Sequence, residues 1–198
     1  MHILRKVDNK AIFLSSEFEL SFLNFLKRNF AKEPIRFAAR TASTRTKNGE
    51  TLQVTGEEFE GMIVYIRVTT QGTAFVIIAD KEYPKSAAFK VTAEIEKRFF
   101  LFKSEEQLSN FNSDTDVGFS ELPELLKKYQ DPDQADKLRK IESQLTEIET
   151  NLSKTMSELL ERGENLDDLM KASEDIGNTA FQFYQNAKKT NQRCCSLY

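Results

Sequence analysis

The pattern of apolar and polar positions divides the chain into two parts with different periodicities. In residues 1–129, short apolar-rich runs alternate with turn signals and with stripes of helical spacing, which is typical of a mixed α and β domain. In residues 137–193, apolar residues recur at alternating intervals of three and four, which is the repeat of a coiled coil. Residues 130–136 hold acids and a proline and few apolar side chains, so we place a linker there.

The first part predicts a sheet flanked by helices. Expected strands cover Ile3 to Val7, Ala11 to Ser15, Thr51 to Val54, Met62 to Thr69 and Ala74 to Asp80, the first two forming a hairpin around Asp8-Asn9-Lys10. Expected helices cover about Ile35 to Thr46, with Pro34 in the first turn, Pro84 to Phe102, and Ser120 to Tyr129. The periodicity of residues 18–30 does not decide between helix and loop. The fold class is therefore α+β, a five-stranded and mainly antiparallel sheet with helices on its faces.

The second part predicts one continuous seam of about seven heptads. Its core positions are Leu138, Ile141, Leu145, Ile148, Leu152, Thr155, Leu159, Arg162, Leu166, Leu169, Ser173, Ile176, Ala180, Phe183, Ala187 and Thr190. A stripe this narrow fits other helices of the same kind better than a globular core. Gly163 and Gly177 lower its intrinsic helix propensity, so we expect the segment to become fully helical only when partner helices bind it.

Arg162 occupies a core position of this seam, between Leu159 and Leu166. A guanidinium has five donors and no acceptor, so its burial in a helical seam costs free energy unless side-chain oxygens surround it. We expect the partner helices to present such oxygens, for example from glutamines, and to fix the register of assembly there. The alternative is that Arg162 extends to the surface of an ordinary coiled coil, in which case Arg162→Leu strengthens assembly without loss of register.

Composition and charge exclude several classes. Hydrophobic residues make up 39% of the 198, including 16 Phe, so a core can form, and the net charge of −3 gives no indication of nucleic acid as a partner. The longest uncharged apolar run, Ala74 to Ala79, is far shorter than the roughly twenty residues of a membrane span, and the N-terminus has no signal-peptide stretch. One His and two adjacent cysteines, Cys194 and Cys195, provide neither a disulfide framework nor a zinc site. No catalytic motif appears, so we expect no enzyme and no cofactor.

The chain resembles the lipid-anchored longin-type R-SNAREs, which lack a transmembrane helix. Leu159 to Leu169, with the sequence LLERGENLDDL, is similar to the centre of the R-SNARE motif, and Arg162 falls on its ionic central layer. Residues 1–129 look like a longin domain, which is profilin-like, and VIIADKEYP at Val76 to Pro84 is close to its strand-to-helix junction. The linker sequence Tyr-Gln-Asp-Pro from Tyr129 and the Cys194-Cys195 pair also resemble this group. Residues 1–60 match mostly in pattern.

This resemblance implies a function in membrane fusion. One R-SNARE helix and three Q-SNARE helices form a parallel four-helix bundle, with three glutamines around Arg162, and zippering draws a vesicle and its target membrane together. The longin domain folds back on the SNARE segment and shields its seam and lipid. We therefore expect a protein that cycles between the cytosol and the cytoplasmic face of Golgi, vesicle and endosomal membranes. The alternative is a non-fusogenic longin and coiled-coil module that tethers or inhibits SNARE assembly.

The tail at residues 194–198 predicts lipid attachment. Cys195-Ser196-Leu197-Tyr198 fits the C-a-a-X pattern for prenylation, and Cys194 is placed for palmitoylation. One lipid gives reversible membrane binding and two give stable binding, so the pair predicts a switchable anchor. Relatives commonly have methionine where this chain has Tyr198, so the choice between farnesyl and geranylgeranyl stays open, as does the alternative of two unmodified cysteines.

Phe37, on the helix after Pro34, aligns with an apolar family position on the longin surface that contacts the SNARE segment. The alternative is that Phe37 belongs to the core of the domain. Phe37→Glu separates the two, because global unfolding indicates the core and a folded but open chain indicates the regulatory surface.

Overall fold

The structure, a computed structural model, describes residues 1–21, 25–56, 61–136, 152–182 and 184–185. Its centre is a six-stranded sheet in the order β2-β1-β5-β4-β3-β6. The strands are β1 (His2–Val7), β2 (Lys10–Ser16), β3 (Thr51–Thr55), β4 (Met62–Val68), β5 (Thr73–Asp80) and β6 (Leu152–Thr155). Neighbouring strands pair antiparallel except β3 and β6, which are parallel.

The five predicted strands are confirmed, and the sheet has a sixth that the sequence did not predict. The hairpin of β1 and β2 turns at Asp8, whose φ of 52° lies in the left-handed region that Asp tolerates better than most residues. β6 comes from the part of the chain with the coiled-coil repeat and joins the free edge of β3. The five-stranded sheet predicted for the domain is therefore confirmed, and β6 extends it because an edge strand offers unpaired backbone groups to an extended segment that reaches it.

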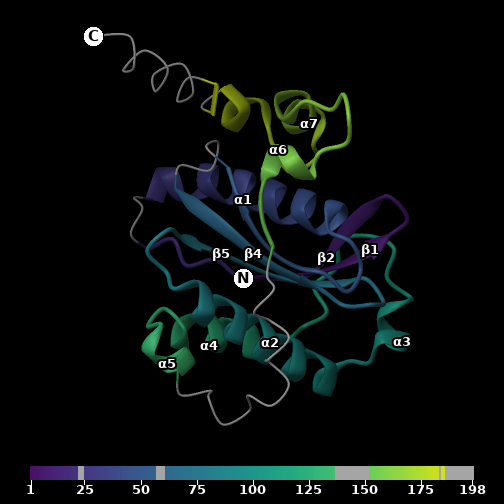
Figure 1. Cartoon of the computed structure of the whole chain (residues 1–198), viewed down its shortest axis with the longest axis vertical. Coiled ribbons are helices and arrows are strands. Elements are labelled where there is room, and N and C mark those ends of the chain that lie inside the picture. Colours follow the sequence, from purple (N-terminus) through teal and green to yellow (C-terminus); the bar gives the residue numbers. More distant parts are fainter. Residues whose placement is uncertain (22–24, 57–60, 137–151, 183, 186–198) are drawn as a thin grey trace.

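Helices cover both faces of the sheet (Figure 1). They are α1 (Phe25–Arg45), α2 (Lys85–Phe102), α3 (Glu105–Leu108), α4 (Glu121–Lys128), α5 (Asp133–Asp136), α6 (Met156–Leu159) and α7 (Leu166–Ala172). α1 lies on one face, with α6 and α7 above it, whereas α2, α4 and α5 lie on the other face. The α+β layering and the helices predicted after Pro84 and Ser120 are confirmed.

The first long helix begins earlier than predicted. α1 starts at Phe25 and contains Pro34 in its interior, so the placement of Pro34 in a first turn was wrong. A proline removes one helical hydrogen bond and normally disfavours this position. The helix continues through it because Phe37, Ala38 and Ala39 on the C-terminal side are buried in the core on this face of the sheet, and this packing outweighs the local preference.

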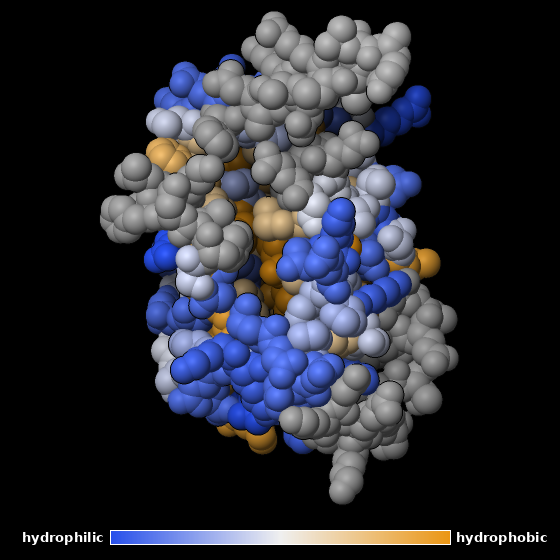
Figure 2. Space-filling view, turned by 90° about the vertical axis from the view of Figure 1, so that its left-hand side faces the viewer, coloured by the Kyte–Doolittle hydropathy of each residue, from blue (hydrophilic) through white to orange (hydrophobic). Residues whose placement is uncertain are grey.

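The alternation of side chains along each strand builds two separate cores. In β5, Phe75 and Ile77 point to the face covered by α2 and α4, whereas Ala74 and Val76 point to the face covered by α1. In the side view of Figure 2, hydrophilic residues dominate the lower half of the surface, and hydrophobic atoms are visible in a narrow band at mid-height.

The part of the chain with the coiled-coil repeat is not one long helix here. Its described residues form β6, α6, α7 and a last helical stretch at residues 178–182, joined by turns. The continuous seam was expected for the assembly with partner helices, and it stays a prediction for that state. In the single chain the segment wraps over the α1 side of the domain, so we call residues 152–182 and 184–185 the docked segment.

Candidate functional site

The docked segment attaches first through its backbone. β6 runs parallel to β3, with Leu52 opposite Leu152 and Thr55 opposite Thr155. The strand ends where Thr155 begins α6 with a capping box: its hydroxyl accepts from the Glu158 N–H at 3.3 Å, and its own N–H donates to Glu158 Oε2 at 2.6 Å. This cap turns the chain from the sheet edge onto the α1 face.

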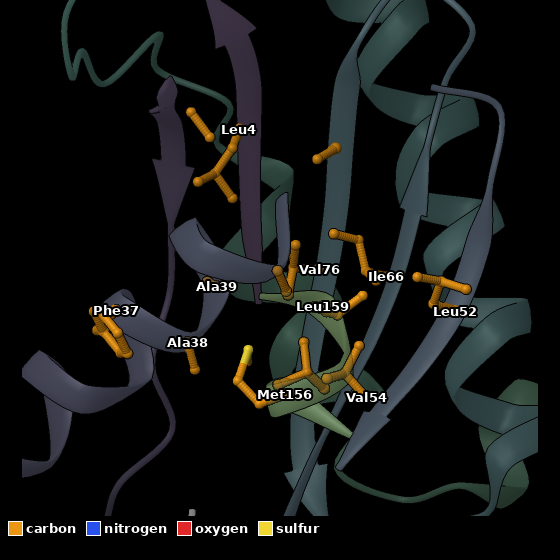
Figure 3. Packing of buried hydrophobic residues seen from close by; sticks show 14 of the residues in the cluster. Leu4, Phe37, Ala38, Ala39, Leu52, Val54, Ile66, Val76, Met156 and Leu159 are labelled. Atoms are coloured by element: carbon orange, nitrogen blue, oxygen red, sulfur yellow. The ribbon is translucent and has the colours of Figure 1, made fainter. Parts of the chain in front are cut away.

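Apolar side chains of the docked segment complete the core on that face. Figure 3 shows Met156 and Leu159 among Val54, Ile66 and Val76 of the sheet, next to the alanines of α1. Met156 is fully buried and Leu159 is 8% exposed. The other buried members from this segment are Leu166, Met170, Ile176 and Ala180, while Leu160, Leu169, Phe181 and Tyr184 pack partly buried around them. Burial of each large apolar side chain contributes about 1.5–3 kcal/mol, so these contacts supply most of the docking free energy.

A cluster of ion pairs connects the docked segment to α1 near the C-terminal end of the segment. The guanidinium of Arg40 donates to both carboxylate oxygens of Asp175, at 2.5 and 3.0 Å, and to those of Asp114. Arg36 bridges the same two acids, at 3.2 Å to Asp175 and 2.9 Å to Asp114. Asp175 is the acid from the docked segment, and its side chain is only 4% exposed. We call Arg36, Arg40, Asp114 and Asp175 the Asp175 cluster.

Hydrogen bonds and ring contacts hold the arginines of this cluster in place, and they favour the charged form of Arg40. Burial lowers the pKa of Arg40, but its hydrogen bonds to Asp175 and Asp114 more than offset this and raise the pKa above the ordinary value. Burial raises the pKa of Asp114, and the bonds from Arg40 and from the Phe13 N–H outweigh it, so that the pKa lies below the ordinary value. The stabilisation from ionised Asp114 is therefore present above about pH 4 and is lost in acid. Both guanidiniums also stack on the Phe13 ring, at 3.9 and 4.7 Å from its centroid.

A second ionic contact holds the turn that contains Arg162. Arg45, at the end of α1, donates to Glu161 at 2.6 Å and pairs also with Glu164. Between these two acids the chain reverses at Arg162 and Gly163, and Gly163 has a φ of 94° that side chains disfavour. Arg162 itself is exposed. We call Arg45, Glu161 and Glu164 the Arg45 cluster.

The structure brings some of the predicted seam residues together and leaves others apart. Leu159, Leu166, Ile176 and Ala180 are buried in one cluster with Phe37, and Leu169 packs against it. Ser173 is half-buried, whereas Leu152 and Thr155 are exposed together with Arg162. The remaining positions lie outside the residues whose side chains are described: Leu138, Ile141, Leu145, Ile148, Phe183, Ala187, Thr190, Cys194 and Cys195.

Two buried methionines were missed by the sequence reasoning. Met156 follows the seam position Thr155, and Met170 follows Leu169. Met156 lies three positions before the seam residue Leu159, and Met170 lies four positions after the seam residue Leu166, so each shares a helix face with a seam leucine. That spacing was the available signal, and both methionines are buried in the docked segment. The ionic clusters were missed because they join the arginines of α1 to acids between 74 and 139 positions away in the sequence.

The described residues contain neither a membrane-spanning helix nor a group of metal ligands. No helix among those residues is both long and apolar enough to cross a membrane. Within the same part of the chain, no His, Cys, Asp and Glu side chains are grouped as metal ligands. The docked segment contacts the domain through the edge of β3, the apolar cluster on the α1 face and the arginines of α1.

Comparison with known proteins assigns both parts of the chain. Residues 18–130 match the family model for longin, described as a regulated-SNARE-like domain, and residues 137–196 match the synaptobrevin model. The synaptobrevin homolog YKT6 of Debaryomyces hansenii is 35% identical over 196 residues, which cover 98% of this chain and 96% of that protein. The YKT6 homologs of Candida glabrata and Saccharomyces cerevisiae are 34% and 32% identical, and the matches cover 96% and 98% of this chain and 91% and 96% of those proteins. The chain belongs to the synaptobrevin family, as one of its longin-type R-SNAREs.

Proposed function

We propose that this R-SNARE acts in vesicle fusion and that the docked segment represents its inhibited state. The proposal rests on one observation: side chains expected to form the core of a SNARE bundle are also the ones that contact the longin domain in the single chain. Leu159, Leu166, Ile176 and Ala180 are expected core layers of a SNARE bundle, and in the single chain they are buried against the longin domain. One side chain cannot fill both cores at once, so docking and bundle assembly exclude each other.

Assembly requires the docked segment to leave and to straighten. Three Q-SNARE helices then bind the seam from Leu138 to Thr190, and glutamine oxygens surround Arg162. The turn at Arg162 and Gly163 must become helical, which breaks the Arg45 cluster. Because Arg162 and Leu152 are exposed in the docked form, they are accessible to partner helices before the buried layers are released.

The membrane anchor is a second part of the proposal. Cys195 carries a prenyl group and Cys194 a reversible palmitoyl group, and Lys188, Lys189 and Arg193 add attraction to an anionic leaflet. Removal of the palmitoyl group releases the protein into the cytosol. Renewed palmitoylation of Cys194 at Golgi, vesicle or endosomal membranes restores stable membrane binding. All of these residues lie outside the described ranges, and mass spectrometry of the membrane-bound protein tests the two modifications.

Met156→Glu tests the inhibition directly, because Met156 is buried in the docked form and is not a bundle layer. The substitution should release the docked segment, leave the domain folded and speed the formation of an SDS-resistant complex with three Q-SNARE helices. Phe37→Glu should have the same effect from the domain side. Ser157→Glu, at an exposed neighbour of Met156, is the matched control and should assemble at the unaltered rate.

The outcomes separate the proposal from its alternatives. If Met156→Glu releases the segment and assembly is no faster, docking does not inhibit. If Phe37→Glu unfolds the whole domain, Phe37 is core rather than regulatory surface. If the doubly lipidated chain assembles with Q-SNARE helices and fails to fuse liposomes, it is a non-fusogenic binding module.

A further inference from the structure

The helix α1 is strongly basic, although the whole chain is slightly acidic. The net charge of all 198 residues is −3, yet α1 alone contains six basic residues and one acidic residue, Glu33. The basic residues are Lys27, Arg28, Lys32, Arg36, Arg40 and Arg45. A concentration of one sign on one helix creates a local potential that the net charge of the protein does not reveal.

The docked segment neutralises this helix. Asp175 pairs with Arg36 and Arg40, and Glu161 and Glu164 pair with Arg45, so three acids of the segment face three arginines of α1. Glu33, the one acid of α1, accepts from the Gly177 N–H of the segment at 2.8 Å. When the segment leaves, the arginines lose these partners, and Asp114 is the acid of the domain that remains beside Arg36 and Arg40.

The same helix also presents an aromatic side chain to solvent. Phe30 is 41% exposed, and it precedes Lys32, whose ammonium lies 5.5 Å from the centroid of the Phe18 ring. Basic residues combined with exposed aromatic side chains are the composition of helices that bind at the surface of anionic membranes. An acidic protein partner would use the cations but would give no reason for an exposed Phe.

We infer that α1 is a contact surface for anionic membranes, and that Asp175, Glu161 and Glu164 occupy it as an internal substitute for lipid headgroups. The inference rests on the proposed function, because the contact requires the docked segment to leave. It adds a regulator to that function: an anionic bilayer competes with the acids of the docked segment and favours the open chain. A SNARE is then released for assembly preferentially where a suitable membrane is present.

The test uses the full unlipidated chain and co-sedimentation with two kinds of vesicle, phosphatidylcholine alone and phosphatidylcholine with phosphatidylserine. The first variant combines Asp175→Asn, Glu161→Gln and Glu164→Gln. Its control combines Glu174→Gln, Asp168→Asn and Glu82→Gln, which makes the same change in net charge at exposed acids outside the two clusters. Amide exchange of residues 152–182 measures opening separately in each variant.

The first variant should open and should bind phosphatidylserine vesicles about tenfold or more tightly than the unaltered chain, since each released arginine adds roughly fivefold. The control should stay docked and bind like the unaltered chain. Addition of Arg36→Gln and Arg45→Gln to the first variant should remove the gain while the chain stays open. The gain should also decrease as salt is raised.

Different failures overturn different statements. If the first variant opens and its binding to phosphatidylserine vesicles is no tighter than that of the control, α1 is not a membrane surface, and the proposed inhibition stands. If its gain survives the arginine substitutions, the binding comes from another part of the chain and the inference is wrong. If all variants stay docked, the acids do not hold the segment, and the competition with lipid fails.

Discussion

On the α2 side of the sheet, the core is rich in aromatic side chains and is closed by helices that follow the sheet directly in sequence. On the α1 side, the core is mainly aliphatic and is completed by a segment from far along the chain. Phe75, Phe99 and Phe119 meet edge to face on the first side, with centroids 5.4 and 5.8 Å apart. On the second side, α1 contributes Ala38 and Ala39, and Met156 fills the space that they leave.

This difference separates the part of the core that defines the domain from the part that can be exchanged. Large interlocking aromatic side chains resist removal, since any opening exposes them together. The small alanines of α1 leave room that Met156 of the docked segment occupies, and methionine adapts to irregular packing better than a branched residue does. On the proposed function, one face keeps the domain folded and the other releases the docked segment.

The largest effect is expected from Phe99→Ala, on the aromatic side. Phe99 is fully buried, so the substitution should lower the free energy of unfolding by about 3–5 kcal/mol. Urea denaturation followed by circular dichroism measures this. A loss confined to the docked segment, with the domain unchanged, would contradict the assignment of this face as the permanent core.

Met156→Ala should weaken docking rather than the domain. Truncation of a fully buried methionine to alanine costs about 2–5 kcal/mol. Here it destabilises the docked form of the chain and leaves the free energy of unfolding of the domain unchanged. Amide exchange in β6 and α7 should become faster, while exchange in β5 stays as it was. Equal acceleration in both regions would show that the two cores unfold as one.

Asp175→Asn should have a smaller effect of the same kind. The asparagine keeps the shape but loses the charge that two arginines share, and a lost charged hydrogen bond costs about 1–3 kcal/mol. The docked segment should exchange faster than in the unaltered chain. Glu174→Gln, at the exposed neighbour, is the matched control, and an equal effect of both variants would mean that the Asp175 cluster contributes nothing to docking.

The smallest effect concerns His2, at the edge of the α1 face. Burial, the N-terminal amine and Arg36 lower the pKa of His2 well below its ordinary value near 6.5. The unfolded state therefore binds the proton more readily, and the free energy of unfolding should fall as the pH drops below about 6.5, by up to about 1.4 kcal/mol per pH unit.

His2→Gln, which retains a group able to bond the Ser16 hydroxyl, should reduce this dependence between pH 5.5 and 7.5. The remaining slope belongs to the buried N-terminal amine, whose pKa is lowered to about 5 by burial. An unchanged slope in the variant would show that His2 does not titrate differently in the folded state.

The sequence predicted the elements whose pattern is local. The hairpin around Asp8 and the helix after Pro84 follow from turn residues and periodicity over a few turns. The start of α1 at Phe25 could not be predicted from the local pattern, because burial of Ile35 and Phe37 overrides the preference of Pro34 for a first helical turn. The sequence pattern of residues 137–193 predicts a helix in the partner-bound state. It contains no local signal that Leu152 to Thr155 form a strand, since that depends on the free edge of β3.

The same reasoning explains what could be predicted of the site. Arg162 and the apolar layers were visible as a periodic pattern and its interruption. The two ionic clusters depend on the fold of the domain, because Arg40 and Asp175 come together only when α1 is in place. The spacing of Met156 and Met170 from seam leucines was visible in the sequence, but their burial depends on the fold of the domain.

The central claim is that the docked segment leaves while the domain stays folded. Amide exchange of the full chain, measured alone and after assembly with three Q-SNARE helices, tests it most directly. The account predicts that β3 loses protection on assembly, because its edge partner β6 is gone, and that β4 and β5 keep theirs. Retained protection of β3 in a chain that has assembled would contradict the account.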